Sequence, residues 1–405
     1  MSSIPSSLVE GCIRYSTRTT YGTLRRCSPP TPRIMSTSSS TNLLAFAMCT
    51  FNARDLQSQL VRKKLSEALE RSSRARRHIS LDLLLATMSS SADLKTYAGN
   101  CHCGAIKFTV SLPPLESTPL RACTCSICTK KGYLFVSLKK SAMSVTKGAG
   151  SDGLGGGVLV DYAFNDKKML HRFCGRCGTP FGVVRQGMGP EDGFALNARM
   201  LMGVDLWALD VKEGSGMAPE TVYTPRVFPQ LDEIKAQTLD DGEKIYTGSC
   251  HCGSIAYALK SPRDLATPVE ENKCLECDCS TCIRHAGMYT YPRPRSRVSV
   301  DTAAADALRT YISPVGKGFG GAQFCAICGC HLFQNLIGPP AEKVAAAPAH
   351  VQERIRETLD CKPVHLRSLD IALGLTDAAK EEWIAVKKQV QREKGESGRD
   401  TVRCA

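Results

Sequence analysis

The sequence predicts a mainly β protein with two tandem zinc-binding domains. Three observations support this prediction: an internal duplication, a cysteine pattern that recurs within it, and short β-rich segments in both copies. The duplication extends beyond the cysteines, because residues 99–106 (GNCHCGAI) return as 248–255 (GSCHCGSI), and 172–178 (RFCGRCG) return as 323–329 (QFCAICG). Self-similarity of this kind indicates repeated structural units, so we expect two domains of one kind.

Short runs rich in β-branched and aromatic residues, separated by Gly and Pro, indicate small twisted sheets in both copies. The expected strands of the first copy are Ile106–Val110, Tyr133–Leu138, Val158–Phe164, Phe181–Val184 and Phe194–Ala198. The matching strands of the second copy are Ile255–Leu259 and Leu332–Leu336. A Gly-rich stretch at 148–157 is typical of a hairpin loop inside the first copy.

Composition and repeats divide the chain into five parts. They are a basic low-complexity leader (1–93), a first zinc-binding domain (94–211), a linker (212–243), a second zinc-binding domain (244–375) and a charged helical tail (376–405). An insertion of helical character at Pro339–Arg356 interrupts the second copy. We expect the tail to form a solvated helix without a chemical role.

The leader permits two interpretations. Residues 1–40 are rich in Ser, Thr and Arg, as a mitochondrial transit peptide is, and a basic, roughly amphipathic stretch at 55–86 could form a helix. Alternatively, residues 1–87 are a disordered or dispensable extension, since Met88 offers a second start only 13 residues before the first motif cysteine. We expect a cytoplasmic protein, with mitochondrial import left open by the leader.

Charge and cysteine usage narrow the class of protein. The formal net charge of +13 belongs largely to residues 1–87, and zinc-bound thiolates would reduce it to about +7. A nucleic-acid partner is therefore not expected from charge alone, and no apolar run is long enough to cross a bilayer. Close-set cysteine pairs in a large chain without a secretory signal favour reduced, metal-bound thiolates over disulfides. The sequence does not determine the oligomeric state.

Four cysteines in each copy have the spacing of a structural zinc site. Residues two apart in a strand project from the same face, so Cys101 and Cys103 can bind one metal ion. The segment from Cys174 to Cys177, followed by Gly, has the form of a zinc knuckle. Together they give four thiolates and a closed tetrahedral site. The corresponding residues of the second copy are Cys250, Cys252, Cys325 and Cys328.

The middle of each copy carries three further cysteines within six residues. They are Cys123, Cys125 and Cys128 in the first copy and Cys277, Cys279 and Cys282 in the second. Three protein ligands and one open position form the arrangement of a catalytic zinc. Two alternatives remain for the first cluster: a distant fourth ligand, His102 or His171, or three free thiols without metal.

The second copy differs beside its cluster. Cys274 lies three residues before the cluster and His285 three residues after it, and either could close the fourth position and make this cluster structural. Cys330 and His331, beside the second knuckle, are also additional, although buried cysteines commonly act as plain hydrophobic residues. If the copies are unequal, we expect the first domain to be the active one.

The combined pattern is Gly-x-Cys-x-Cys-Gly, then Cys-x-Cys-Ser-x-Cys, then Phe-Cys-x-x-Cys-Gly, and both copies carry it. It resembles the pattern of the glutathione-dependent formaldehyde-activating enzyme family, which includes centromere protein V. The resemblance covers residues 94–372 and implies a β-tent zinc fold for each copy. It also implies up to four zinc ions per chain: two structural ions in the four-cysteine sites, and two in the three-cysteine clusters, where the family places its glutathione site.

By the same resemblance, the implied reaction joins formaldehyde or a related small carbonyl to glutathione, the co-substrate, and gives S-(hydroxymethyl)glutathione. Written in reverse, this is a carbon–sulfur lyase reaction. Zinc suits it, because the ion acts as a Lewis acid and lowers the pKa of a thiol. Three basic residues flank the first cluster and could bind glutathione carboxylates, or could simply be solvated: Lys130, Lys131 and Arg121.

An alternative from another class is a zinc-stabilised module that binds a protein or nucleic acid without catalysis, as centromere protein V suggests. Closed three-cysteine clusters would favour this module, whereas an open site would favour the enzyme. The sequence has no aromatic-plus-basic strand motif of the RNA-reading kind, which makes nucleic acid the less expected partner. A redox role ranks last, because the Cys-x-x-Cys pairs lack βαβ surroundings.

Overall fold

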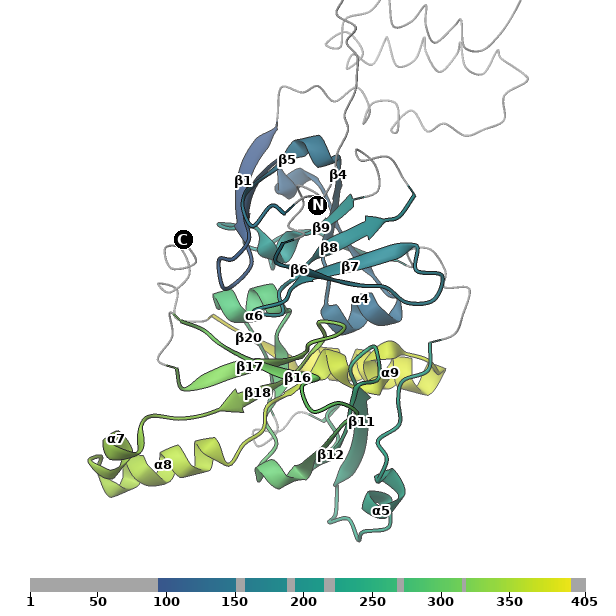
Figure 1. Cartoon of the computed structure of the whole chain (residues 1–405). Helices are drawn as coiled ribbons and strands as arrows, with labels where there is room; N and C mark the ends of the chain where they lie inside the picture. Colours follow the sequence, from purple (N-terminus) through teal and green to yellow (C-terminus); the bar gives the residue numbers. More distant parts are fainter. Residues whose placement is uncertain are drawn as a thin grey trace, which may run out of the picture. The chain divides into compact units, whose positions relative to one another are not determined.

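Each copy of the duplication folds into a three-stranded sheet and a seven-stranded sheet (Figure 1). The computed structural model describes residues 94–150, 157–187, 194–214, 223–267, 273–314 and 318–394, all within one compact unit, Ser91–Ala405. The expectations for the leader (1–93) and for most of the Gly-rich loop (148–157) lie outside these described residues. We refer to residues 94–214 as the first repeat and residues 244–394 as the second repeat.

The two repeats have the same strand order. In the first repeat, the small sheet runs β1 (Lys95–Asn100), β2 (Lys107–Leu112), β5 (Met143–Lys147), and the large sheet runs β10 (Val211–Gly214), β3 (Leu120–Cys123), β4 (Phe135–Leu138), β9 (Phe194–Asn197), β8 (Pro180–Arg185), β7 (Met169–Cys174), β6 (Leu159–Tyr162). In the second repeat, the small sheet runs β11 (Lys244–Ser249), β12 (Ile255–Ser261), β15 (Val298–Thr302), and the large sheet runs β20 (Val390–Glu393), β13 (Cys274–Cys277), β14 (Met288–Thr290), β19 (Val364–His365), β18 (His331–Leu336), β17 (Gly320–Cys325), β16 (Leu308–Ile312). The predicted mainly β fold with two sheet-rich domains is confirmed.

Short helices connect these strands. The α-helices are α4 (Ser126–Lys131), α5 (Leu231–Lys235), α6 (Ser280–His285), α7 (Ala341–Ala345), α8 (Ala349–Leu359) and α9 (Asp377–Gln389), and the 3-10 helices are η3 (Leu115–Ser117), η4 (Lys140–Ala142), η5 (Ala198–Met200), η7 (Arg295–Arg297), η8 (Leu366–Ser368) and η9 (Asp370–Leu373). The insertion predicted at 339–356 is formed by α7 and α8, between β18 and β19. It lies outside the pattern of strands that the two repeats share.

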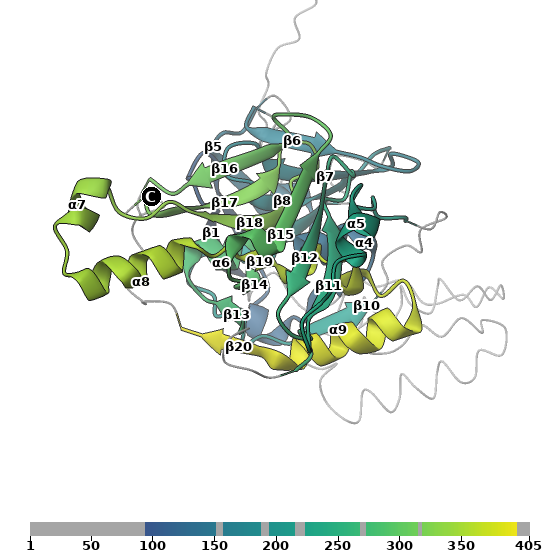
Figure 2. The ribbon, with the colours of Figure 1, turned by 90° about the horizontal axis from the view of Figure 1, so that it is seen from below.

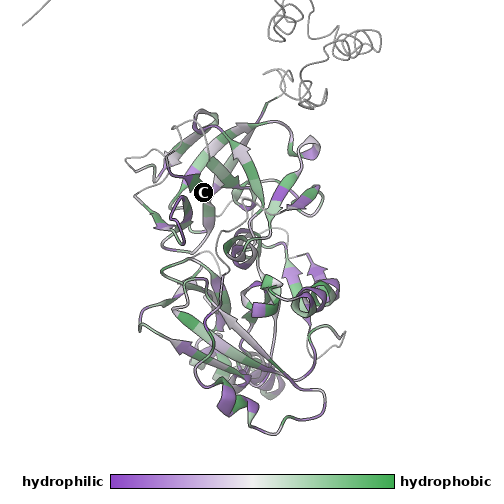
Figure 3. Ribbon diagram, turned by 90° about the vertical axis from the view of Figure 1, so that its right-hand side faces the viewer, coloured by the Kyte–Doolittle hydropathy of each residue, from purple (hydrophilic) through white to green (hydrophobic). Residues whose placement is uncertain are grey.

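Figure 3 shows hydrophobic and hydrophilic residues interspersed along the strands, and in β2 they alternate regularly. In β2, Phe108, Val110 and Leu112 are buried, whereas the residues between them are partly exposed. Residues two apart in a strand share a face, so this alternation directs one face of the strand into the core. The Phe108 ring covers Gly99 on the paired strand β1, where a Cβ would lie only 2.3 Å from the ring. This close approach accounts for the glycine that opens the cysteine pattern.

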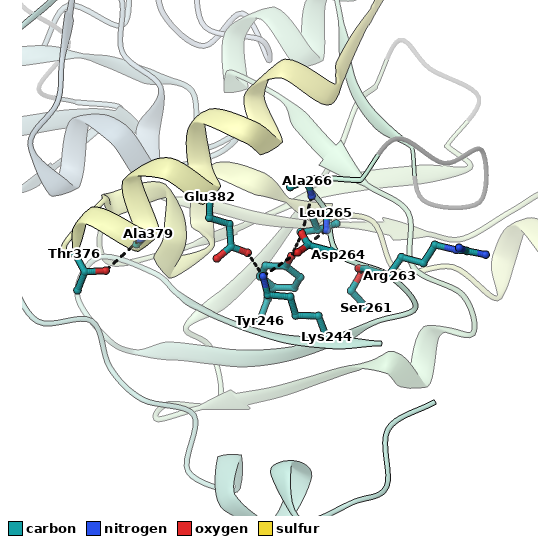
Figure 4. A network of polar contacts seen from close by, with 10 residues as sticks. All are labelled: Lys244, Tyr246, Ser261, Arg263, Asp264, Leu265, Ala266, Thr376, Ala379 and Glu382. Atoms are coloured by element: carbon teal, nitrogen blue, oxygen red, sulfur yellow. Dashed lines mark hydrogen bonds and ion pairs between the residues drawn. The ribbon is translucent and has the colours of Figure 1, made fainter. Parts of the chain in front are cut away.

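The tail predicted at 376–405 begins with the expected helix, α9, but this helix is not wholly solvated. Trp383 and Val386 are buried, and the strand that follows, β20, pairs in parallel with β13. The Lys244 ammonium links α9 to β11, since it lies 2.6 Å from a Glu382 carboxylate oxygen (Figure 4). Figure 2 shows α9 running beside β10, where Lys387 forms an ion pair with Glu213. The apolar face of α9 therefore belongs to the core of the second repeat.

The segment predicted as a linker (212–243) is partly structured. It begins inside β10, which pairs in parallel with β3 of the first repeat. Further on, the Arg226 guanidinium forms an ion pair with Asp301 and donates a hydrogen bond to the Gly253 carbonyl. These contacts attach the described part of this segment, which includes residues 223–243, to the second repeat.

The two repeats pack together through equivalent elements. The Lys130 ammonium, on α4, donates to the Ser249 and Ser368 carbonyls at 2.9 and 3.1 Å. Its counterpart on α6, Arg284, donates to the backbone and side-chain oxygens of Asn100. Asn100 and Ser249 occupy the same position, just before the first motif cysteine of each repeat. The interface thus has approximate two-fold symmetry.

The knuckle glycines lie at the same interface. Gly329 has φ of 71°, and a Cβ on it would lie 2.4 Å from the ring of Phe173 in the first repeat. Gly178 has φ of 74°, and a Cβ there would meet Phe324 and His331 of the second repeat. The Phe173 and Phe324 rings meet edge to face, with centroids 6.5 Å apart. Within the described residues, no helix combines the length and apolar character of a membrane span.

We predict that Gly329→Ala destabilises the protein more than Gly203→Ala does. Both glycines have a positive φ, which costs about 1–2 kcal/mol for an alanine, but a Cβ at Gly203 would meet nothing within 4 Å. The clash of the methyl group added at Gly329 with the Phe173 ring should contribute overpacking of about 1–3 kcal/mol. Thermal unfolding of both variants at matched zinc content measures the difference. Equal melting temperatures would contradict this packing of the knuckle.

Candidate metal centres and active site

Four sulfur atoms converge in each repeat. In the first repeat, Cys101 and Cys103 follow β1, and Cys174 and Cys177 belong to the knuckle after β7; all four sulfurs lie within 4.8 Å of one another. The Cys101–Cys103 and Cys103–Cys174 sulfur distances are 3.5 and 3.7 Å. Tetrahedral zinc with Zn–S bonds of about 2.3 Å places its sulfurs about 3.8 Å apart, whereas a disulfide needs about 2.05 Å. The donor set fits a closed zinc site.

The second repeat reproduces this site with Cys250, Cys252, Cys325 and Cys328. The Cys250–Cys252 and Cys252–Cys325 sulfur distances are 3.5 and 3.6 Å. A backbone amide points at the first sulfur in both repeats: the N–H of Ile106 donates to Cys101, and that of Ile255 donates to Cys250, each at 3.3 Å. An amide that donates to a sulfur favours its thiolate form.

The thiols of the four-sulfur site differ in pKa because they lie so close together. Hydrogen bonding with Cys103 raises the pKa of Cys101, while hydrogen bonding with Cys101 lowers the pKa of Cys103. One thiol therefore keeps its proton while its neighbour loses it. Four thiolates at this spacing would repel one another unless a cation were bound between them. A bound divalent ion removes that conflict, because all four sulfurs can then be thiolates.

The three-cysteine clusters form where a strand meets a short helix. Cys123 ends β3, Cys125 is the N-cap residue of α4, and Cys128 lies within α4. The three sulfurs lie within 4.8 Å of one another, and the cluster of Cys277, Cys279 and Cys282 has the same arrangement between β13 and α6. Hydrogen bonding with Cys123 is the largest effect that raises the pKa of Cys125, to about 11. In the second cluster, hydrogen bonding with Cys279 lowers the pKa of Cys277, so the close-set thiols again differ in pKa.

None of the residues considered as a fourth ligand, near or distant in sequence, joins either cluster within the described part of the chain. His171 lies among aromatic rings, with its centroid 5.9 Å from that of Tyr133. Cys274 is buried within β13, and His285 stacks on His331 at a centroid distance of 4.0 Å. Among the described residues, each cluster therefore brings together three sulfur atoms and no fourth His, Cys, Asp or Glu donor.

His102, the remaining candidate, contacts the cluster helix of the other repeat. Its Nε2 lies 3.0 Å from the Ser280 hydroxyl on α6, and its Nδ1 lies 2.9 Å from the Tyr311 hydroxyl. The equivalent contacts of His251 are to Ser126 on α4 at 3.0 Å and to Tyr162 at 2.8 Å. Each four-sulfur loop thus contacts the three-sulfur helix of the opposite repeat.

Burial lowers the pKa of His251 to about 3, so the ring is neutral at neutral pH. A neutral imidazole donates from one nitrogen and accepts at the other, which suits one serine and one tyrosine partner. The only signal for this arrangement in the sequence is that the Cys-His-Cys element occurs in both copies. That signal could not indicate which residues the histidines contact.

A pocket of about 830 Å³ lies against the first cluster, between the two repeats. Cys123 and Cys128 line it, and the second repeat contributes Arg367, Glu276 and Trp383. Cys277, Cys279 and Cys282 do not line this pocket. The two clusters are alike in sulfur geometry but differ in their relation to this cavity.

The basic residues predicted to bind glutathione lie elsewhere. Lys130 is fully buried at the repeat interface, where it binds two carbonyls and lies 3.7 Å from Asp370. Lys131 is also buried, with its ammonium 4.6 Å from the centroid of Phe173, and burial lowers its pKa. Arg121 is exposed on β3. None of these three side chains lines the pocket, and their role in binding glutathione stays a prediction.

A family model described as glutathione-dependent formaldehyde-activating enzyme matches residues 96–195 and 245–363, which together exceed half of the chain. The chain belongs to this family. The two matched regions correspond to the two repeats and confirm the resemblance drawn from the cysteine pattern. The chain is also similar to a Rhodobacter sphaeroides protein of known crystal structure: the two are 27% identical over 28% of this chain and 99% of that chain, with a TM-score of 0.24.

Family membership supports an enzyme of the glutathione-dependent formaldehyde-activating type, and the cysteine clusters could bind zinc. Sequence reasoning missed the residues that line the pocket beside the first cluster. Arg199 lies in η5, Arg367 lies in η8, and the two tryptophans, Trp207 and Trp383, come from different repeats. Arg199 and Arg367 recur two residues before Leu201 and Leu369, at equivalent positions of the duplication, and this recurrence could have indicated them, whereas no spacing marks the tryptophans.

We predict that zinc content distinguishes ligands from neighbouring cysteines. Cys277→Ser should lower the zinc content by one ion per chain, because it leaves two sulfurs in its cluster. Cys274→Ser should leave the content unchanged, since this buried side chain lies outside the cluster. Metal analysis of the purified variants measures both. Loss of zinc from Cys274→Ser, or none from Cys277→Ser, would show that the ligand set is different.

Proposed function

We propose that the protein joins a small carbonyl compound, formaldehyde in the first instance, to the thiol of glutathione. In this reaction a bond forms between the thiol sulfur and the carbonyl carbon, and the thiol proton is transferred to the carbonyl oxygen. The product is S-(hydroxymethyl)glutathione, and the reverse reaction is that of a carbon–sulfur lyase. One observation carries the proposal: the three sulfurs of Cys123, Cys125 and Cys128, with no fourth protein ligand among the described residues, lie beside a pocket large enough for a tripeptide.

Zinc held by these three cysteines would supply Lewis-acid chemistry and lower the pKa of a nearby thiol. The chain itself holds the cluster rigidly. Cys123 is fixed at the end of β3, which pairs with both β4 and β10, and α4 is fixed by the contacts of Lys130 with the second repeat. Ser126, the first residue of α4, is hydrogen-bonded to His251. Rigid support of this kind keeps the sulfurs converged without a substrate.

The pocket would orient the substrate and exclude water from its reacting end. Its lining combines apolar side chains, among them Leu134, Leu206 and Met288, with seven charged residues. In small-molecule sites, apolar walls bury the ligand and polar groups fix its orientation. Orientation alone can accelerate a reaction between two small molecules substantially, because it removes the entropy cost of their encounter.

The four-sulfur sites would have a structural role. Each joins the turn after the first strand to the knuckle some 70 residues later, as the Cys103 and Cys174 pair shows. Closed four-thiolate zinc is typical of such sites, and it contributes roughly 10–16 kcal/mol to the folding of small domains. The proposal therefore assigns different roles to the two kinds of cluster in one repeat.

We predict that Cys125→Ser removes the acceleration of glutathione–formaldehyde exchange, as measured by NMR at fixed pH. A fall of about 100-fold or more in the enzyme-dependent rate is expected, because Lewis-acid stabilisation is worth several kcal/mol. The control is Cys361→Ser, which changes a buried cysteine outside the clusters and should retain the rate. Cys174→Ser should instead unfold the first repeat.

The same assay separates the repeats and the classes of function. Cys279→Ser should retain most of the rate if the first cluster is the working one. Equal loss of folding in Cys125→Ser and Cys174→Ser would argue against a catalytic role for the first cluster. No acceleration by zinc-loaded wild-type protein would refute the proposed reaction and favour a zinc-stabilised binding module.

A further inference from the structure

Basic residues outnumber acidic residues around the pocket, and not all of them have an ion-pair partner. Five basic residues line it, Arg199, Arg367, Lys380, Lys387 and Arg392, against two acidic ones, Glu213 and Glu276. Both acids are already engaged: the Glu276 carboxylate lies 3.3 Å from Arg392, and that of Glu213 lies 3.5 Å from Lys387. Lys380 pairs with Asp377. Arg199 and Arg367 are the basic side chains of this pocket that form no ion pair with a described carboxylate.

These two arginines lie near each other although they come from different repeats. Arg199 is buried, its Nε donates to the Gly132 carbonyl at 2.7 Å, and burial together with the charge of Arg367 lowers its pKa to about 9. The Nε of Arg367 is buried without a hydrogen-bond partner. The carboxylate of Glu276 opposes the lowering of both arginine pKa values, and that of Glu213 opposes the lowering for Arg367, but these two acids are paired with Arg392 and Lys387 and offset the charge only in part. A bound anion would complete the compensation.

Two further features of the pocket suit an organic anion. The chain has two tryptophans, Trp207 and Trp383, and both line the pocket. The indole Nε1 of Trp207 is buried without a hydrogen-bond partner, and the Arg392 guanidinium lies 5.2 Å from the centroid of the indole ring. The unpaired polar groups here are thus donors, and aromatic surface beside them can cover the carbon skeleton of a ligand.

We infer that the second repeat supplies the carboxylate-binding half of the site whose reactive half is the cluster of the first repeat. Arg367, assisted by Arg199, receives a carboxylate of the thiol substrate, while Cys123 and Cys128 lie beside its sulfur. The substrate class is a small peptide-like thiol that carries carboxylates. This inference rests on the proposed function for the identity of the thiol, but its binding contacts can be tested without any reaction.

The pocket lies across the interface, so each repeat supplies part of its lining. The residue equivalent to Glu276 in the first repeat is Ala122, and the cluster cysteines of the second repeat are absent from the lining of this pocket. The second repeat thereby acts here as a binding partner built into the same chain.

The first test uses the wild-type, full-length protein and a ligand that cannot react. The probe is γ-glutamyl-alanyl-glycine, which has the two carboxylates of glutathione but no thiol, and its diethyl ester is the matched uncharged control. Because both tryptophans line the pocket, intrinsic fluorescence reports binding directly. We expect saturable binding of the acid and at least about tenfold weaker binding of the diester, since a hydrogen bond to a charged group contributes about 1.5–3 kcal/mol.

The second test changes the protein. Arg367→Met should raise the Kd of the same probe by about 10–100-fold, and Arg367→Lys should restore part of the loss because it keeps the charge without the planar fork. Arg356→Met, at an exposed position on α8, is the matched control and should leave the Kd unchanged. If Arg367→Met does not fold, the comparison of acid and ester on the wild type decides.

The outcomes distinguish this inference from the proposed reaction. Equal binding of the acid and the diester, or an unchanged Kd in folded, zinc-loaded Arg367→Met, would overturn the inference even if exchange activity is present. Carboxylate-dependent binding that requires Arg367 supports the inference, including in a protein that does not accelerate the exchange. In that case only the proposed reaction fails.

Discussion

The convergence of four sulfur atoms at the knuckle is the constraint from which the other features follow. It holds the turn after the first strand against a turn 71 residues later, as the Cys103–Cys174 distance shows. The four-sulfur site positions two features at the repeat interface. One is the knuckle glycine, against which Phe173 or Phe324 of the other repeat packs, and the other is the histidine between the first two cysteines. That histidine in turn contacts the opposite cluster helix, so the four-sulfur site of one repeat is joined to the three-sulfur cluster of the other. The architecture couples the repeats reciprocally.

Duplication followed by divergence accounts for a symmetric interface with an asymmetric pocket. Positions that hold the repeats together keep equivalent roles, as Lys130 and Arg284 do when each donates to the residue before the first motif cysteine. Around the pocket, some positions are equivalent, as Arg199 and Arg367 are, and others differ, as Ala122 and Glu276 do. The second repeat also carries α9, an additional helix whose Trp383 lines the cavity. The residues that hold the repeats together are therefore constrained by stability. The pocket residues that differ between the repeats are free to specialise one cluster.

The features that the sequence predicted are those that depend on local spacing. Cysteines at set intervals converge because strand and turn geometry places their sulfurs, and alternating apolar residues mark the strands. Lys130 and Lys131 were candidate ligand-binding residues because they adjoin the cluster, yet one turn of helix directs both into the repeat interface. Arg199 and Arg367 occupy equivalent positions of the duplication, but that they meet at one pocket follows only from the packing of distant segments. The burial of α9 escaped prediction for the same reason, since two apolar residues among many charged ones leave little periodic signal.

The three-sulfur clusters would contribute to the fold even if neither took part in a reaction, because each joins the end of a strand to the start of a helix at the interface. The first cluster is the one whose cysteines line the pocket between the repeats. The cavity holds two guanidinium groups that form no ion pair among the described residues, and Glu276 and Glu213, which pair with Arg392 and Lys387, offset their charge only in part, which is costly in the free protein. Such a cost is tolerated where an anionic ligand offsets it. The charge imbalance at Arg199 and Arg367 is thus the feature that most clearly separates a ligand site from a purely structural cluster.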